Sequence, residues 1–103
     1  MVIATFIFRP RAENADFHAL NDRIRQVAES SEGYLGRKAW RDDTGLEAVV
    51  YYWTSRESLE AFRKDATHRV AKSRYKEWYA GYRIEIAEVL EARGDALFKD
   101  WLS

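Results

Sequence analysis

The stretch of sequence that decides the fold is residues 49–82, VVYYWTSRESLEAFRKDATHRVAKSRYKEWYAGY. It opens on an aromatic strand, residues 48–53, whose two faces are both apolar, so both faces must be covered. The motif T-S-R-E follows directly. There Thr54 can cap the free amides of a helix while Glu57 reaches back to the cap residue. The stretch therefore predicts a buried strand that passes almost without a loop into a helix and ends in a second aromatic cluster.

The sequence before this stretch predicts a first strand and a first helix. Residues 2–8 are apolar and β-rich, and the strand ends near Pro10, which cannot donate a hydrogen bond to a neighbouring strand. Residues 14–31 carry apolar side chains at the helical period, with charged side chains on the opposite face. We expect Asn14 or Asp16 to cap this amphipathic helix.

A hairpin, a broken helix and a last strand complete the pattern. A strand over residues 34–41 turns at 42–45, D-D-T-G, into the strand 48–53, so these two strands should pair antiparallel. The second helix should run from residue 55 to 77 with a break near residues 65–66. A final strand is expected at 81–90, where apolar and charged residues alternate.

The resulting order β-α-β-β-α-β predicts an α+β protein of the ferredoxin-like type with an antiparallel sheet. The first and third strands should be central, because they are apolar throughout. The second and fourth, marked by charges such as Arg37, Lys38 and Arg83, should form the edges. Two helices can cover only one face of such a sheet. A second copy of the chain is the simplest cover for the other face, which predicts a homodimer.

Length and composition predict one domain over residues 1–91, followed by a C-terminal helical tail over 92–103. In the tail, Gly94 and Asp95 should cap a short helical segment, residues 96–102, with one apolar patch. The chain has no cysteine, which excludes disulfides and thiolate metal sites and makes the reducing cytoplasm the default location.

Charge and hydropathy argue against two classes of partner. Lys plus Arg and Asp plus Glu number 17 each and are interspersed, so no nucleic-acid-binding face is expected. The apolar opening MVIATFIF is too short to span a membrane, so no membrane association is expected. Aromatic residues make up 15% of the chain, which is enough to line a cavity for a small aromatic molecule.

The chain resembles the antibiotic biosynthesis monooxygenase superfamily of dimeric α+β barrels over residues 1–91. The resemblance rests on several short motifs taken together: EGYLG at 32–36, WTS at 53–55, AF at 61–62, ATHR at 66–69, and WY at 78–79 with YRI at 82–84. It implies a homodimer whose two sheets face each other, each protomer keeping a pocket between its sheet and its helices.

The resemblance also implies an activity. One branch of the superfamily oxidises polycyclic phenols with molecular oxygen and needs neither metal nor flavin, so the expected function is that of a cofactor-independent monooxygenase. A second branch degrades haem, with an Asn on the first strand and a His late on the second helix. Residues 2–8 contain no Asn, and Tyr75 stands near the late-helix position. Haem binding through His68 or Tyr75 stays open, as does a non-catalytic ligand-binding or stress-related dimer.

Two residues are candidates for the chemistry. His68 has an intrinsic pKa suited to proton transfer near neutral pH, and the alternative is a structural or surface histidine. Tyr75, seven residues later on nearly the same helical face, could donate a hydrogen bond to a substrate oxyanion. His18, on the first helix beside Phe17, should face solvent.

Four aromatic residues are candidates for substrate binding. Trp53 and Phe62 could stack on a planar substrate, and Trp78 and Tyr79 could extend that wall; ordinary core packing is the alternative for each. We expect Trp53, His68 and Tyr75 to converge on one pocket. Trp40 and Tyr34 should share a face of the second strand, with at least one of them in the dimer interface.

Overall fold

The computed structural model describes residues 1–11 and 14–102, and for residues 66–71 it describes the helical backbone but not the side chains. The elements in chain order are β1 (Val2–Pro10), α1 (Ala15–Glu29), β2 (Tyr34–Arg41), β3 (Glu47–Trp53), α2 (Arg56–Arg63), α3 (Ala66–Trp78), β4 (Tyr79–Glu88) and a 3₁₀ helix, η1 (Ala96–Phe98). Within the described chain, no helix is long and apolar enough to cross a membrane.

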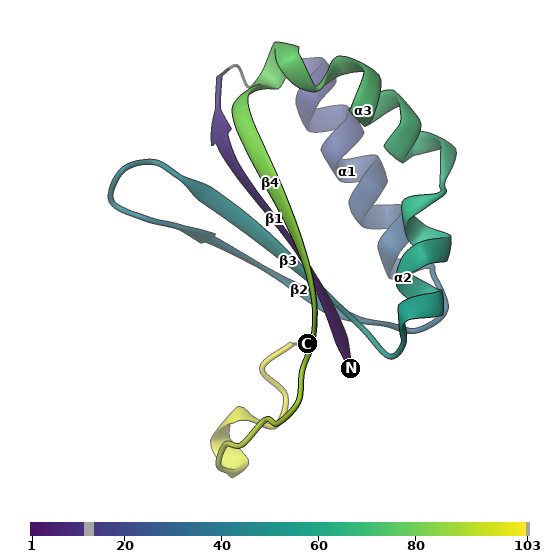
Figure 1. Cartoon of the computed structure of the whole chain (residues 1–103), viewed down its shortest axis with the longest axis vertical. Coiled ribbons are helices and arrows are strands. Elements are labelled where there is room, and N and C mark those ends of the chain that lie inside the picture. The colour runs from purple at the N-terminus through teal and green to yellow at the C-terminus, as the bar shows by residue number, and fades with distance from the viewer. Residues whose placement is uncertain (12–13, 103) are drawn as a thin grey trace.

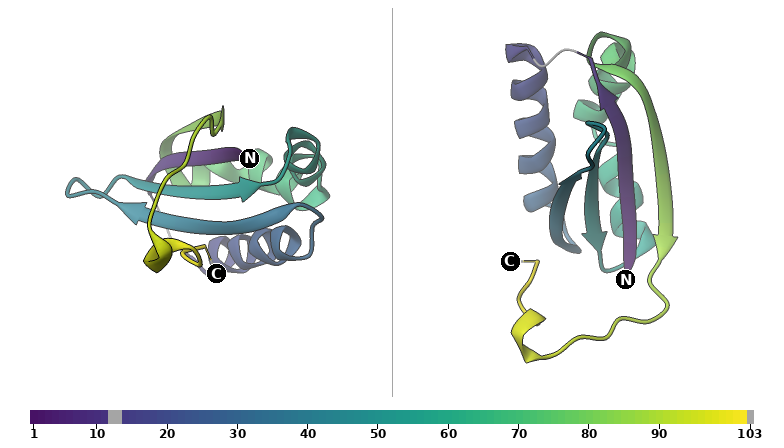
Figure 2. Two further views of the ribbon diagram at one scale, coloured as in Figure 1. Left: turned by 90° about the horizontal axis from the view of Figure 1, so that it is seen from below. Right: turned by 90° about the vertical axis from the view of Figure 1, so that its left-hand side faces the viewer.

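The four strands form one antiparallel sheet in the order β2-β3-β1-β4. This confirms the ferredoxin-like α+β fold, with the first and third strands in the centre. All three α-helices lie on one face of the sheet, and the opposite face carries no α-helix of the described chain (Figure 1, Figure 2). We call these two sides the helix-facing side and the outer side.

The core lies between the sheet and the helices. On β1, Val2 pairs with Trp53 of β3, and two residues further on Ala4 pairs with Tyr51. All four side chains belong to the core against the helices, because side chains two apart on a strand share a face. Leu59 of α2 fills the same core and is fully buried.

The helix caps agree with the prediction at α1 and differ from it at α2. The Asn14 side chain accepts a hydrogen bond from the Phe17 amide at 2.9 Å, as a cap residue should. At α2 the cap is Ser55, which accepts from the Ser58 amide at 3.2 Å, and the predicted cap by Thr54 is wrong. The cap lies one residue later than predicted because the Thr54 amide is still tied to the loop before β2, where it donates to the Gly33 carbonyl at 2.8 Å.

A β-bulge in β2 overturns a second prediction. The register on β3 moves by only one residue between Tyr34, opposite Trp53, and Gly36, opposite Tyr52, so one extra residue is inserted. Such an insertion reverses the facing of everything beyond it. Tyr34 therefore packs on Trp53 at 5.6 Å between ring centroids on the helix-facing side, while Trp40 lies on the outer side.

The predicted break in the second helical region is confirmed, since α2 ends at Arg63 and α3 begins at Ala66. The last strand begins earlier than predicted. Trp78 is the final residue of α3 and Tyr79 the first of β4, with no residue between them.

The tail after β4 contains the short 3₁₀ helix η1 and otherwise no helix or strand among its described residues. The Asp95 side chain accepts from the Leu97 amide at 2.9 Å, as expected for its cap. The tail leaves the end of β4, stands away from the body and returns toward it at residue 102 (Figure 2). Its apolar side chains differ in burial, because Trp101 packs on Tyr52 while Leu97 is exposed.

Candidate functional site

The positively charged side chain of Arg37, on the edge strand β2, lies on the helix-facing side of the sheet. Arg37 of β2 pairs with Tyr51 of β3, and its guanidinium carbon lies 5.8 Å from the centre of the Tyr51 ring on the helix-facing side. Tyr51 in turn packs on Phe62 of α2, with ring centroids 5.3 Å apart. Arg37 therefore reaches a largely apolar interior, where a positive charge acts more strongly on an anion than it does in water.

Three tyrosine hydroxyls on the helix-facing side hold their protons tightly, and two of them, those of Tyr34 and Tyr51, interact with Arg37. Burial raises the pKa of the Tyr51 hydroxyl, and the charge and hydrogen bonding of Arg37 oppose only part of that shift. Burial, with smaller contributions from Tyr51 and Glu47, raises the pKa of Tyr79 to about 12. Burial also raises the pKa of Tyr34. At neutral pH these groups are hydrogen-bond donors, suited to an oxyanion.

Buried donors in the same interior lack partners. Among the described residues, Arg37 Nε, Trp53 Nε1 and Trp78 Nε1 are buried without a hydrogen-bond acceptor. An unsatisfied buried donor costs about 1–3 kcal/mol, so such groups call for a specific reason. A bound ligand with acceptor oxygens would supply one. We define Tyr34, Arg37, Tyr51 and Tyr79 as the donor cluster.

A groove of about 580 Å³ opens beside this interior, between the end of α1 and helix α2. Phe62, Val27 and Ala61 supply its apolar lining, and serines and charged side chains form the rest. Since Phe62 also touches Tyr51 and Trp53, a single aromatic ring separates the groove from the donor cluster.

The structure brings together two of the four predicted substrate-binding residues. Trp53 stacks near Phe62 with ring centroids 4.9 Å apart. Trp53 is 0% exposed, so it supports Phe62 from behind and does not itself line the groove.

The other two lie in a second aromatic group near the far end of β1. Trp78 and Tyr79 pack against Phe17 of α1, with ring centroids 5.7 and 6.0 Å away. Tyr51 contributes to the raised pKa of Tyr79, so the hydroxyls of the two residues interact electrostatically. Tyr79 therefore links the two groups.

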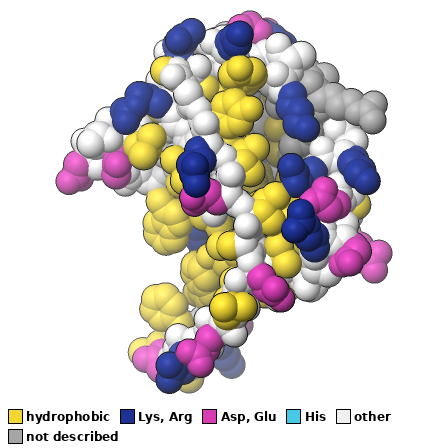
Figure 3. All heavy atoms as spheres, viewed as in Figure 1, with side chains coloured by type: hydrophobic (Ala, Val, Ile, Leu, Met, Phe, Trp, Pro, Cys, Tyr) yellow, Lys and Arg dark blue, Asp and Glu magenta, His cyan; other side chains and the backbone are white. Residues whose placement is uncertain are grey.

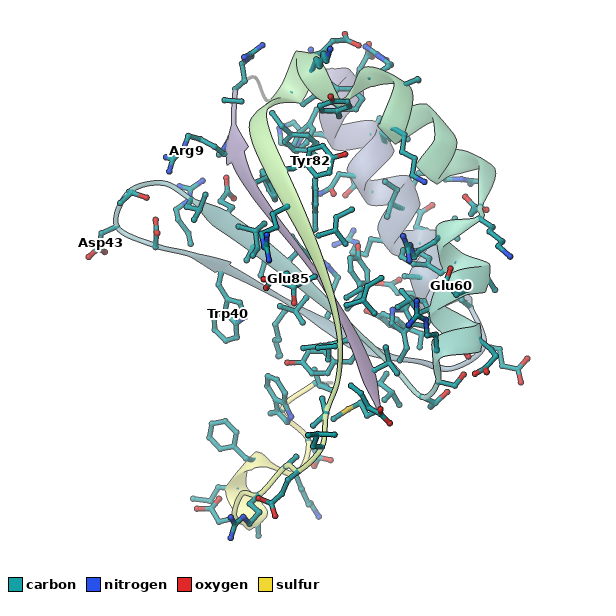
Figure 4. All side chains as sticks on the ribbon, in the orientation of Figure 1. Arg9, Trp40, Asp43, Glu60, Tyr82 and Glu85 are labelled. Atoms are coloured by element: carbon teal, nitrogen blue, oxygen red, sulfur yellow. The ribbon has the colours of Figure 1, made fainter. Side chains whose placement is uncertain are left out.

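The predicted convergence of Trp53 and Tyr75 is not found. Tyr75 packs on Tyr82 of β4, with ring centroids 5.1 Å apart, near the junction of α3 and β4 (Figure 4). Tyr82 pairs with Phe8 of β1, whereas Trp53 pairs with Val2. Six residues of strand separate the two positions by about 20 Å.

The two histidines lie on different helices, His18 on α1 and His68 on α3. His68 belongs to the backbone of α3, but its side chain lies outside the described part of the structure. His18 is exposed on α1, as predicted. Within the described residues, no group of three or more His, Asp or Glu side chains is arranged to hold a metal ion.

The sequence reasoning missed Arg37 and Tyr51 as site residues. Arg37 was interpreted only as a charge that marks an edge strand, and Tyr51 as part of the apolar central strand. A signal was available, because counting back from the hairpin turn at residues 42–46 places Arg37 opposite Tyr51.

Comparison with known proteins identifies the family. Residues 5–86 match the monooxygenase af470-like family, which covers most of the chain. The chain belongs to this family and therefore to the antibiotic biosynthesis monooxygenase superfamily, a class of oxidoreductases. The resemblance seen in the sequence is thus confirmed.

Individual relatives are more distant. The uncharacterized protein YqjZ of Bacillus subtilis is 29% identical over 69 residues, which are 66% of this chain; the match spans 60% of the length of YqjZ. Among solved structures, SnoaB, a cofactor-independent oxygenase from Streptomyces nogalater, has a TM-score of 0.75 at 9% identity, covering 91% of this chain and 97% of SnoaB.

Two further structures share the fold. A putative antibiotic biosynthesis monooxygenase from Deinococcus radiodurans has a TM-score of 0.75 at 20% identity, over 92% of this chain and 98% of its own. Rv0793 from Mycobacterium tuberculosis has a TM-score of 0.74 at 16% identity, over 90% of this chain and 98% of Rv0793.

Proposed function

We propose that this protein is a cofactor-independent monooxygenase that oxidises a small aromatic or polycyclic phenol with molecular oxygen, working as a cytoplasmic homodimer. The observation that carries the proposal is the donor cluster. A half-buried arginine, whose Nε is buried and has no acceptor among the described residues, lies beside tyrosines that stay protonated, which suits the anion of a phenol better than a neutral molecule.

The donor cluster supports one task, which is to hold the oxygen of the ionised substrate. Arg37 compensates its charge, and Tyr51 and Tyr79 donate hydrogen bonds to it. Fixing the charge in a dry interior keeps the substrate in its electron-rich form. Phe62, whose ring packs on Tyr51 beside the donor cluster, provides the apolar surface against which the aromatic ring of the substrate rests.

The substrate supplies the electrons for the reaction. An anthrone loses a proton from its CH₂ group, and the resulting anion passes one electron to O₂. The radical pair then combines in a C–O bond. Loss of water from the hydroperoxide leaves a new carbonyl, so one oxygen atom enters the quinone and the other leaves as water with the two hydrogens of the CH₂ group.

We assign removal of the first proton to His68 and a hydrogen-bonding role to Tyr75. The intrinsic pKa of histidine suits this transfer. Trp53, Trp78 and Tyr79 form the aromatic surroundings. The outer side of the sheet is assigned to a second copy of the chain, since its central strands are apolar and no α-helix in the described part of the chain covers them.

The test uses 1,8-dihydroxyanthrone in air-saturated buffer, with quinone followed by absorbance and oxygen by electrode. We expect quinone and consumed oxygen in equal amounts, at a rate well above that of buffer. His68→Gln should lower kcat about 100-fold or more, the range of general-base catalysis. An exposed arginine of α1 provides the matched control, Arg23→Gln, which should not change the rate.

Two results would count against the proposal. If the protein binds the phenol but gives no quinone above the buffer rate, it is a ligand-binding protein. If His68→Gln keeps the full rate, the base lies elsewhere.

A further inference from the structure

The C-terminal tail exposes large apolar side chains that its own fold leaves uncovered. Leu90 is 92% exposed, Leu97 91% and Phe98 66%. Exposed leucine and phenylalanine side chains so close together are unusual on a protein surface that meets only water. They make this segment, residues 89–102, a candidate interaction surface.

Both ends of the tail are held in place. At its start the Val89 amide donates to the Met1 carbonyl at 2.9 Å. At its end the Trp101 ring packs edge-on against Tyr52 at 5.4 Å, and the Lys38 ammonium lies 5.5 Å from its centre. Tyr52 and Lys38 belong to the outer side of the sheet.

The contact at Gly36 shows how closely the end of the tail fits. A side-chain carbon at Gly36 would lie 2.7 Å from the carbonyl oxygen of Leu102, closer than any normal contact. The tail is therefore seated against the bulge of β2, and the exposed Leu97 and Phe98 lie between two fixed points.

The outer side of the sheet and the tail form one apolar surface. Trp40 is 58% exposed and projects from β2 toward the side on which the tail lies (Figure 4). In the space-filling view, hydrophobic side chains continue from the hairpin down to the tail (Figure 3). The tail thus extends the face that the proposed homodimer uses.

We propose that the tail is an arm that grips the second copy of this chain, with Leu97 and Phe98 buried against the partner. This inference rests on the proposed homodimer and assigns the tail a part in it. A two-fold interface uses the same surface on both copies, so an arm at its rim acts twice.

Charge favours a second copy over a lipid surface. Residues 89–102 contain three acidic side chains, Glu91, Asp95 and Asp100, and two basic ones, Arg93 and Lys99. Segments that bind anionic membranes carry an excess of Lys and Arg, which this one lacks. On the outer side of the sheet Arg83 is paired with Glu85 at 2.9 Å, so two such faces can meet without repulsion.

The test measures the dimer dissociation constant by sedimentation across chain concentrations. The double variant Leu97→Asp/Phe98→Asp should raise it about 100-fold or more, since burying either side chain favours association by one to two powers of ten. The matched control is Arg93→Gln, an exposed tail residue whose change should alter the constant less than threefold. Circular dichroism confirms that each variant is folded.

The outcomes separate the two proposals. If the unmodified chain is a monomer at all concentrations, the homodimer fails and the arm with it. If the unmodified chain is a dimer and the double variant dissociates no more readily, the arm alone is overturned. Flotation with phosphatidylglycerol vesicles that is lost in the double variant would also overturn it, because the tail would then bind lipid.

Discussion

The guanidinium of Arg37 lies over the ring of Tyr51, with its central carbon 5.8 Å from the ring centre. The two residues face each other across β2 and β3, so the backbone pairing of the hairpin sets their separation. The arginine of an edge strand thereby reaches the interior, where its Nε has no acceptor among the described residues. The rigid sheet presents this donor without help from a loop.

Replacing this arginine should weaken phenolate binding. We expect Arg37→Met to raise the dissociation constant of an ionised hydroxyanthraquinone about 10- to 100-fold, because a charged hydrogen bond contributes about 1.5–3 kcal/mol. Fluorescence titration measures the effect, and Arg23→Met is the exposed control. Equal affinity in wild type and Arg37→Met would exclude the donor cluster as the anion site.

Tyr79 should make the protein sensitive to alkali. Its folded-state pKa is raised to about 12, whereas an unfolded tyrosine ionises near pH 10. The unfolded state therefore releases the proton first. The contribution of Tyr79 to stability is complete below about pH 10 and is lost as pH rises to about 12. The measurement is the urea midpoint of unfolding as a function of pH. In Tyr79→Phe this midpoint should fall less steeply between about pH 10 and 12 than in wild type, and an equally steep fall would contradict the prediction.

Gly33 and Gly45 form a matched pair for backbone strain. Their φ angles are +84° and +86°, so alanine at either position should cost about 1–2 kcal/mol. At Gly33 the new carbon would also meet Ser58 Oγ and, at 2.7 Å, Thr54 Oγ1, whereas nothing lies within 4 Å at Gly45. We expect Gly33→Ala to cost about 1–3 kcal/mol more, by urea unfolding at one chain concentration. If the two alanine variants lose the same unfolding free energy, the loop around Gly33 must shift to make room for the new side chain.

A second pair of variants tests which residue caps α2. Ser55→Ala removes the acceptor of the Ser58 amide and should cost about 1 kcal/mol of unfolding free energy. Thr54 is exposed and is not the cap, so Thr54→Ala should lower the unfolding free energy clearly less. A larger loss at Thr54 than at Ser55 would reverse the assignment.

Strand order was predictable because the central strands differ in composition from the edges. The strand over residues 48–53 is apolar on both faces and can only be buried, and the alternation in β4 indicates a partly wet edge. The helix break near residue 65 was equally visible. Each of these patterns is carried by several residues, so an error at one position does not change the prediction.

The site was less predictable because it depends on single insertions and on distance. One bulge near Gly36 separates Tyr34 from Trp40, and composition does not reveal it. Tyr75 follows Trp53 in the sequence with only α2 between their two elements, yet the strand pairing holds them far apart. Arg37 looked like any surface charge until its cross-strand partner was known.

The direct passage from Trp78 to Tyr79 limits how this sequence can evolve. With no residue between α3 and β4, one inserted residue must either displace the helix or exchange the two faces of the strand, turning Ile84 and Ile86 outward. The hairpin tip at residues 42–46 has no such restriction. Length differences among homologous sequences should therefore collect at the hairpin tip and be absent at the 78–79 junction.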